Sequence, residues 1–273
     1  MTLNCNGKIL DLSTRKIMGI INISDDSFYD GGRYNTVDKV NSQVKNLISN
    51  GAEIIDIGAA SSKPGSKLID SKSELDKISD YIIELTNNFK DIHLSIDTYN
   101  SDVAEFALSK GFSIINDISA GRYDSNMFNV VKDFNAGYIL MHMLGDPENM
   151  QEDPRYDNVV ESIQIFLKNK IQKLQESGVY NIMIDPGFGF GKSIDDNFRI
   201  LKELESLQSL KKPIIVGLSR KSMIYKTLNI TAEESLNGTT ALNTFALEKG
   251  ANILRVHDAK EALQCINLVG RLN

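Results

Sequence analysis

Cysteine is scarce in this chain of 273 residues. Cys5 and Cys265 are the only two, so the sequence offers neither a disulfide framework nor a Cys-x-x-Cys pair of the kind that binds zinc. A protein that does not depend on disulfides fits a reducing compartment, and a cytoplasmic location is expected.

Long apolar runs and an excess of positive charge are also missing. The longest apolar runs, such as 16–23 and 253–256, are far shorter than the roughly 20 residues that cross a bilayer, so no membrane partner is expected. The opening stretch MTLNCNGKILDL lacks the basic and apolar regions of a secretory signal. The formal net charge of −6 argues against nucleic acid as a main partner, because phosphate binding normally needs a basic surface.

What the sequence does contain is a recurring pair of patterns. A short apolar run rich in Ile and Val is followed by an amphipathic segment, and this happens eight times without a linker or a low-complexity stretch. Strands that are buried on both faces have such continuous apolar runs. The runs are 16–22, 53–58, 92–97, 112–117, 137–142, 181–185, 213–219 and 252–257.

The alternation predicts a single α/β domain over 1–273, folded as a (β/α)₈ TIM barrel. In the helix-like segment that follows the first run, Thr36 is the expected N-cap. The segment before the runs carries an Asn6-Gly7 turn between short apolar stretches, which predicts an N-terminal β-hairpin over the N-terminal mouth of the barrel. The alternative is an open doubly wound sheet, for which the sequence gives no reversal signal.

The stretch MIDPGFGFGKS (183–193) ends like a nucleotide-binding P-loop. The P-loop pattern requires a glycine five positions before the Gly-Lys-Ser glycine, but Pro186 stands there and has no N–H to offer a phosphate. The glycines therefore predict a tight backbone path, and Lys192 is expected to lie on the surface or to stabilise the loop.

Polar residues follow or end nearly every apolar run, and these ends meet at the C-terminal face of a barrel. They are Asn22, Asp56, Asp97, Asn116, His142, Asp185, Ser219 to Lys221, Arg255 and His257. Asp97, Asn116 and Asp185 supply oxygens that suit a flat heterocycle with several N–H groups. The cations Lys63, Arg255 and His257, with the hydroxyls of Ser61 and Ser62, suit a phosphate or diphosphate.

With these residues in place, the sequence resembles the dihydropteroate synthase family of pterin-binding barrels. The matching stretches are MGIINISDDSFYDGG (18–32), DIGAASSKPG (56–65), SIDT (95–98), INDIS (115–119), LMHMLGDPENMQ (140–151), DPGFGFGKS (185–193), GLSRKSMI (217–224) and RVHD (255–258). They cover nearly all of the chain in family order. The resemblance implies a soluble transferase of folate biosynthesis that is a sulfonamide target, and a homodimer that contacts through its outer helices.

The resemblance also implies roles for individual residues. The pterin would contact Asp97, Asn116, Ile118, Met141, Asp185, Phe190 and Lys221. The diphosphate would contact Asn22, Ser62, Lys63, Arg255 and His257, and Asn22 would also help to place Mg²⁺. The p-aminobenzoate would contact Phe28, Ser62, Pro64 and Ser222. The residues implied to be catalytic are Asp30, Asn22, Lys221, Arg255 and His257.

The substrates that the resemblance implies suggest a dissociative, SN1-like reaction. Diphosphate is a good leaving group once its charge is neutralised, whereas an arylamine is a weak nucleophile. Asp30 would stabilise the pterin cation, and the site would act mainly through electrostatic preorganisation.

Two loops depart from the usual family pattern. Ser24-Asp25-Asp26 stands where Thr-Pro-Asp is usual, and AASSKPG stands where GESTRPG is usual, so Lys63 replaces an arginine and loses its two-pronged grip on phosphate. Weaker diphosphate binding is expected. Two alternatives stay open: a pterin-dependent methyltransferase that serves a corrinoid partner, and a non-catalytic pterin-binding protein.

Overall fold

The computed structural model covers residues 1–273 and describes all of them except 24–32, 61–64 and 273. Its centre is a sheet of eight parallel strands within the described residues. The strands are β3 (Lys16–Asn22), β4 (Ile54–Gly58), β5 (His93–Asp97), β6 (Ile114–Asp117), β7 (Gly137–Met141), β8 (Ile182–Asp185), β9 (Ile215–Val216) and β10 (Ile253–Val256). Each lies within one of the eight apolar runs, because residues buried on both faces must be apolar throughout.

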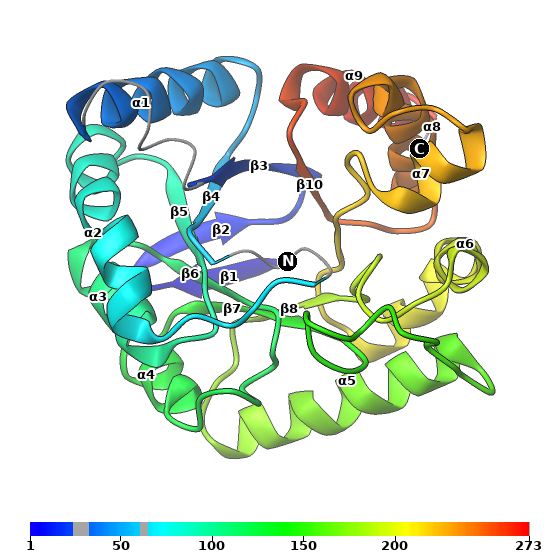
Figure 1. Cartoon of the computed structure of the whole chain (residues 1–273), viewed down its shortest axis with the longest axis horizontal. Helices are drawn as coiled ribbons and strands as arrows, with labels where there is room; N and C mark the ends of the chain where they lie inside the picture. The colour runs from blue at the N-terminus through cyan, green and yellow to red at the C-terminus, as the bar shows by residue number, and fades with distance from the viewer. Residues whose placement is uncertain (24–32, 61–64, 273) are drawn as a thin grey trace.

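The sheet closes into a barrel. Its strands are hydrogen-bonded in the order β8-β7-β6-β5-β4-β3-β10-β9, and a parallel bridge between Ile184 and Ile214 joins the two ends. Figure 1 shows the helices arranged around the strands. The (β/α)₈ prediction is confirmed, and the open doubly wound sheet is wrong.

The helices follow the strands in alternation. They are α1 (Arg33–Ser49), α2 (Ser71–Asn88), α3 (Ser101–Lys110), α4 (Met127–Asp133), α5 (Val159–Glu176), α6 (Ile194–Lys202), α7 (Ser222–Leu228), α8 (Leu236–Glu248) and α9 (Ala259–Val269), with 3₁₀ segments η2 (Leu204–Leu210) and η3 (Glu233–Ser235). The first helix begins at Arg33, three residues before the N-cap expected at Thr36. Within the described residues, no helix is both long enough and apolar enough to span a membrane.

An N-terminal hairpin closes one mouth of the barrel. Its strands β1 (Thr2–Cys5) and β2 (Lys8–Asp11) pair antiparallel across a turn in which Asn6 and Gly7 have φ values of 50° and 83°. Leu3, Cys5, Leu10 and Leu12 pack in one buried cluster with residues from the interior of the barrel. The side-chain amide of Asn6 donates to the carbonyl oxygens of Leu108 and Phe112, which precede β6. The hairpin prediction is confirmed, and the opposite mouth is left for the polar strand ends.

Candidate active site

Four side chains from β10, β4, β5 and β6 form a largely buried polar network at the C-terminal end of the barrel, where only β3 separates β10 from β4. Arg255 on β10 donates from Nε to Asp56 Oδ2 and from Nη2 to Asp97 Oδ2, each over 2.7 Å. Asn116 on β6 donates from Nδ2 to Asp56 Oδ2 over 2.9 Å. Parallel strands in register bring these residues together, although Asp56 and Arg255 are 199 positions apart in the sequence.

The environment of Asp97 makes its carboxyl group a weak acid. Burial raises its pKa to about 7, the Arg255 guanidinium opposes the rise, and the carboxylates of Asp56, Glu74 and Asp117 add to it. Asp97 therefore gains and loses its proton close to neutral pH, where its acceptor capacity changes.

A second pair, Asp185 and Lys221, lies at the end of β8 and just before α7. Asp185 Oδ1 accepts from the backbone N–H of Gly187 over 2.7 Å, and burial raises the pKa of this carboxyl group, partly offset by the positive charge of Lys221. Lys221 Nζ donates to the carbonyl oxygen of Phe188 and lies 4.8 Å from the centroid of the Phe190 ring. Burial lowers the pKa of Lys221 to about 8, and Asp185 limits the fall. A carboxylate and an ammonium thus lie beside an aromatic ring.

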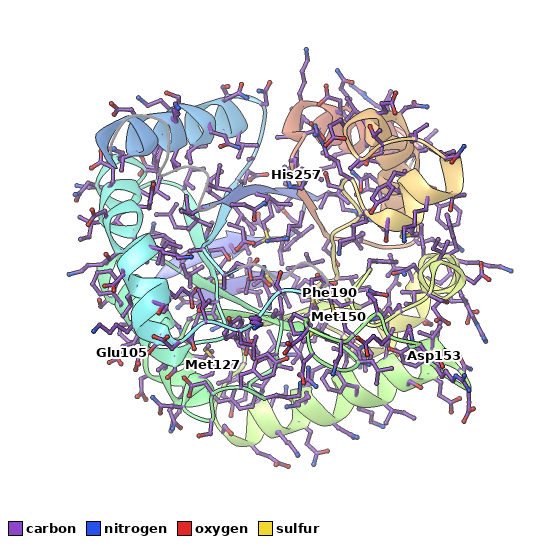
Figure 2. The ribbon with its side chains drawn as sticks, viewed as in Figure 1. Glu105, Met127, Met150, Asp153, Phe190 and His257 are labelled. Atoms are coloured by element: carbon purple, nitrogen blue, oxygen red, sulfur yellow. The ribbon has the colours of Figure 1, made fainter. Side chains whose placement is uncertain are left out.

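An apolar wall completes this side of the pocket. Ile118 and Met141 belong to a buried cluster with Tyr99, Met143 and Met150, and Phe190 packs against it half-buried. Figure 2 places Phe190 and Met150 next to each other, with His257 farther away toward β10. The three apolar residues expected to contact the pterin ring are therefore brought together.

His257 lies next to Ser219 on the other side of the mouth. Its Nδ1 is 3.0 Å from Ser219 Oγ, and its backbone N–H donates to the same oxygen. The His257 side chain is exposed at the rim, but the protein around it removes part of its hydration, which lowers its pKa to about 4, and the charges of Arg255 and Arg220 contribute. The lowered pKa favours a neutral, hydrogen-bonding ring at pH 7 rather than the expected cation, and the role of His257 at the diphosphate stays a prediction.

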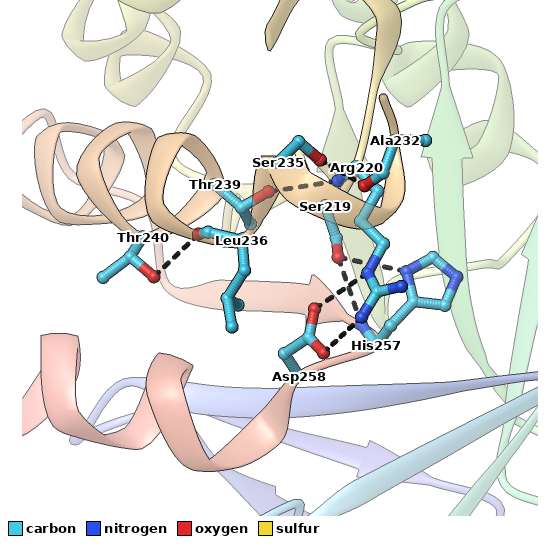
Figure 3. Close-up of polar contacts among 9 residues, drawn as sticks. All are labelled: Ser219, Arg220, Ala232, Ser235, Leu236, Thr239, Thr240, His257 and Asp258. Carbon is cyan, nitrogen blue, oxygen red and sulfur yellow. Dashed lines mark hydrogen bonds and ion pairs between the residues drawn. The ribbon is translucent and has the colours of Figure 1, made fainter. Parts of the chain in front are cut away.

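An ion pair fixes the two loops that carry Ser219 and His257 (Figure 3). Arg220 donates to both carboxylate oxygens of Asp258, from Nε over 3.1 Å and from Nη2 over 2.8 Å. The backbone N–H of Arg220 also donates to Thr239 Oγ1, and Arg220 holds a φ of 57°, which residues other than glycine rarely adopt. These contacts hold Arg220, directly after Ser219, against Asp258, directly after His257.

The glycine-rich stretch after β8 is a loop that packs backbone against backbone. A Cβ on Gly187, which has a φ of 71°, would lie 2.0 Å from the carbonyl oxygen of His142. Lys192 lies buried beneath the loop and donates from Nζ to the carbonyl oxygens of Phe190 and His142. The loop-stabilising role of Lys192 is confirmed, and the surface position is wrong.

The structure describes only some of the remaining predicted site residues. Asn22 is exposed at the end of β3, and Ser222 is half-buried at the start of α7. Phe28, Asp30, Ser62, Lys63 and Pro64 lie outside the described residues. Sequence reasoning gave Asp56 no role, although its position in the second apolar run was a signal for one.

Comparison with known proteins places these residues in a family. Residues 18–257 match the model of the pterin binding enzyme family. The dihydropteroate synthase of Streptococcus pyogenes serotype M3 is 39% identical over 270 residues, which are 97% of this chain and 98% of that protein.

Solved structures that resemble this chain belong to the same family. The Yersinia pestis dihydropteroate synthase with a sulfonamide drug complex superimposes with a TM-score of 0.93 at 35% identity, covering 100% of this chain and 99% of that one. The Xanthomonas albilineans dihydropteroate synthase in complex with 7,8-dihydropteroate gives a TM-score of 0.88 at 32% identity, covering 100% and 98%. The chain therefore belongs to the family of pterin-binding enzymes that includes the dihydropteroate synthases.

Proposed function

We propose that this chain is a dihydropteroate synthase, which joins 7,8-dihydropterin-6-ylmethyl diphosphate to p-aminobenzoate. The C–O bond to diphosphate breaks, a C–N bond to the arylamine forms, and the amine loses a proton to solvent. The observation that carries the proposal is the grouping of three acceptor side chains, Asp97, Asn116 and Asp185, with Lys221 and the Phe190 ring at one mouth of the barrel.

The acceptor side of the pocket suits the pterin. Carboxylate and amide oxygens accept from ring and exocyclic N–H groups, while Lys221 Nζ can donate to a ring nitrogen or oxygen. Phe190, Ile118 and Met141 supply apolar contact for the ring faces. In this arrangement the pterin is held by its edge and its faces, and its methylene group points toward the anion-binding side.

The other side suits the diphosphate. Arg255 uses Nε and Nη2 for its carboxylate partners, and within the described residues its Nη1 has no partner, so two N–H groups are left for an anion. Neutral His257 and the Ser219 hydroxyl add hydrogen-bonding groups nearby. Donors fixed before the reaction stabilise the charge that develops as diphosphate leaves, which favours an SN1-like step.

The residues present also fit Mg²⁺, which the family resemblance implies. Within the described residues, no group of three or more His, Cys, Asp or Glu side chains could hold a metal ion. Mg²⁺ often binds through few protein oxygens together with substrate phosphates and water, so the exposed amide of Asn22 at the rim suits an ion that arrives with the diphosphate. When bound, the ion would neutralise charge on the leaving group.

A homodimer is part of the proposal. Large apolar side chains are exposed on neighbouring outer helices: Leu228 on α7, Phe245 on α8 and Leu268 on α9. Exposed apolar groups of this kind support contact between two copies of the chain, which light scattering of the assayed protein tests.

The test of the function is product formation. Purified protein is mixed with the dihydropterin diphosphate, p-aminobenzoate and Mg²⁺, and both diphosphate and dihydropteroate are measured. We expect equal amounts of both products. Asp185→Asn is expected to lower kcat/KM roughly 10-fold to 100-fold, because a charged acceptor is lost. Asp11→Asn, at the opposite mouth, removes an exposed carboxylate as a control and leaves kcat/KM unchanged.

Two other outcomes of this assay would each lead to a different conclusion. Diphosphate without dihydropteroate would show that the departures in the two loops prevent the arylamine from binding. Pterin binding without either product would support the non-catalytic alternative and contradict the proposal.

A further inference from the structure

Asp56 has none of the roles discussed so far, yet it is the centre of the charged network. It lies in β4 and is fully buried, with an exposed fraction of 0%. Its Oδ2 atom accepts from Nε of Arg255 at 2.7 Å and from Nδ2 of Asn116 at 2.9 Å, and Nη2 of the same guanidinium lies 2.7 Å away in an ion pair. A buried carboxylate oxygen with two hydrogen-bond donors, one of them cationic, is a strong local constraint.

The contact with Asp56 determines which way the Asn116 amide faces. An amide group has a donating end and an accepting end, whereas a carboxylate only accepts. Asp56 therefore requires the NH₂ end of Asn116, and Asn116 Oδ1 is directed away from Asp56 as a free acceptor. Asn116 is the register partner of Asp97 on the neighbouring strand, so the two side chains lie side by side on the same face of the sheet.

The contact with Asp56 also fixes the position of Arg255. Asp56 accepts from Nε and pairs with the nearby Nη2, which itself donates to Asp97 Oδ2 over 2.7 Å. Arginine loses much side-chain entropy when it is held in one conformation, so a fixed guanidinium needs such partners. With Asp56 in place, Arg255 stays on one oxygen of Asp97.

From these contacts we infer that Asp56 is a positioning residue, which makes the pocket accept the N–H groups of the pterin by orienting Asn116 and by holding Arg255 against Asp97. It does so without touching the pterin. The inference rests on the proposed function, because it names the substrate edge that the pocket selects.

The pKa of Asp97 provides a second measurement that tests the inference. Arg255, Asp56, Glu74 and Asp117 all act on Asp97, and Asp56 is the strongest of the carboxylates that raise its pKa. If Asp56 loses its charge, Arg255 serves Asp97 alone and the pKa of Asp97 falls. A residue that only supported the fold would not shift this value in a folded variant.

The experiment is a double-mutant cycle on the binding of 7,8-dihydropterin, which has no diphosphate, measured by calorimetry between pH 5.5 and 8.5. Asp56→Asn is expected to weaken binding roughly 10-fold to 100-fold. In an Asn116→Ala background the same change is expected to cost at least about 5-fold less, because its partner is already gone. The pH midpoint of binding, about 7 in the unmodified protein, should move about one unit toward acid.

Glu74→Gln is the matched control. Glu74 is also fully buried, and like Asp56 it has one carboxylate oxygen without a partner in the part of the chain that the structure describes. Its other carboxylate oxygen accepts from Thr98 and Asn100 rather than from Asn116 or Arg255. We expect its effect on binding to be the same in both backgrounds and its shift of the pH midpoint to be smaller.

Additive effects of Asp56→Asn and Asn116→Ala, with an unmoved midpoint, would overturn the inference. If Asp56→Asn does not fold, Asp56→Glu serves instead: it keeps the charge, so the midpoint should stay within about 0.3 units while binding weakens. A midpoint displaced in Asp56→Glu as well would also overturn it. If the unmodified protein binds dihydropterin and forms no dihydropteroate, the proposed function fails while the role of Asp56 is still tested by binding.

Discussion

At the scale of single residues, the pocket depends on ionisable groups whose pKa values burial has moved toward neutral pH. Asp97 and Lys221 both lie at the proposed pterin site. Burial moves their pKa values toward each other, to about 7 for Asp97 and about 8 for Lys221. One must be ionised to accept a hydrogen bond, and the other must be protonated to donate fully. Together they leave a narrow pH range in which both are in the required state.

A bell-shaped pH profile is therefore expected for kcat/KM, which reports the pKa values of the free enzyme. Below about 7 Asp97 takes up a proton and activity falls, and above about 8 Lys221 loses one and activity falls again. Asp97→Asn should flatten the acid limb, and Lys221→Arg, whose guanidinium stays charged, should flatten the alkaline limb. If both limbs persist unchanged in these variants, other groups control the profile.

Sequence reasoning reached some of these residues and missed others for a physical reason. Asp97 and Asp185 end their strands, Asn116 lies one residue before the end of β6, and the barrel brings these strand ends to one rim. The pairing of Arg255 with Asp56 could not be predicted from the sequence. The two residues lie on β10 and β4, which are separated by β3, so the contact depends on the direction in which the Arg255 side chain extends. The lowered pKa of His257 likewise depends on partial desolvation at the rim and on the charges of Arg255 and Arg220, which only the folded chain brings near it.

At the scale of elements, the loops after the strands are held by specific contacts. Lys192 is the clearest case, since its Nζ donates to Phe190 over 2.8 Å and to His142 over 3.2 Å and so ties the loop after β8 to the end of β7. Burial lowers its pKa to about 7. The loop it supports carries Phe190, which packs against the apolar wall of the pocket.

Lys192→Met should loosen this loop without changing its size, because methionine fills similar space but leaves two carbonyl oxygens without a donor. We expect the free energy of unfolding to fall by about 1–3 kcal/mol and KM for the pterin substrate to rise. Urea denaturation and steady-state kinetics measure the two effects. Lys212→Met, which removes a longer bond of 3.4 Å to Tyr180 near the surface, is the control and should change neither. Equal effects of the two substitutions would contradict the role of Lys192.

The elements themselves follow closely from the sequence. All eight strands lie inside the predicted apolar runs, and β3 matches its run from Lys16 to Asn22. The short β9, Ile215–Val216, is the weakest match, because its predicted run of 213–219 continues past the strand over Gly217 and Leu218 to Ser219 at the site. The helix α1 begins four residues earlier than an N-cap at Thr36 requires, since a threonine is a good N-cap only where the preceding chain is not already helical.

At the scale of the whole molecule, the barrel separates stability from chemistry. The hairpin fills the N-terminal mouth with Leu3, Cys5, Leu10 and Leu12, while the charged network lies at the other mouth. In this fold the C-terminal mouth usually carries the active site, whereas the N-terminal mouth usually contributes to stability. The sequence suggested both ends, because apolar residues precede the first barrel strand and polar residues follow or end nearly every apolar run.

Leu10→Ala tests this separation. Leu10 has an exposed fraction of 2% and lies among the apolar side chains at the base of the barrel, so its truncation should lower the free energy of unfolding by about 2–5 kcal/mol. Ile9→Ala, on the same strand but 61% exposed, should stay within about 0.5 kcal/mol of the unmodified protein. Both variants should keep the kcat/KM of the unmodified protein at temperatures where they are folded. A folded Leu10→Ala protein with reduced kcat/KM would show that packing at the hairpin mouth reaches the charged network, and that the two ends of the barrel are coupled.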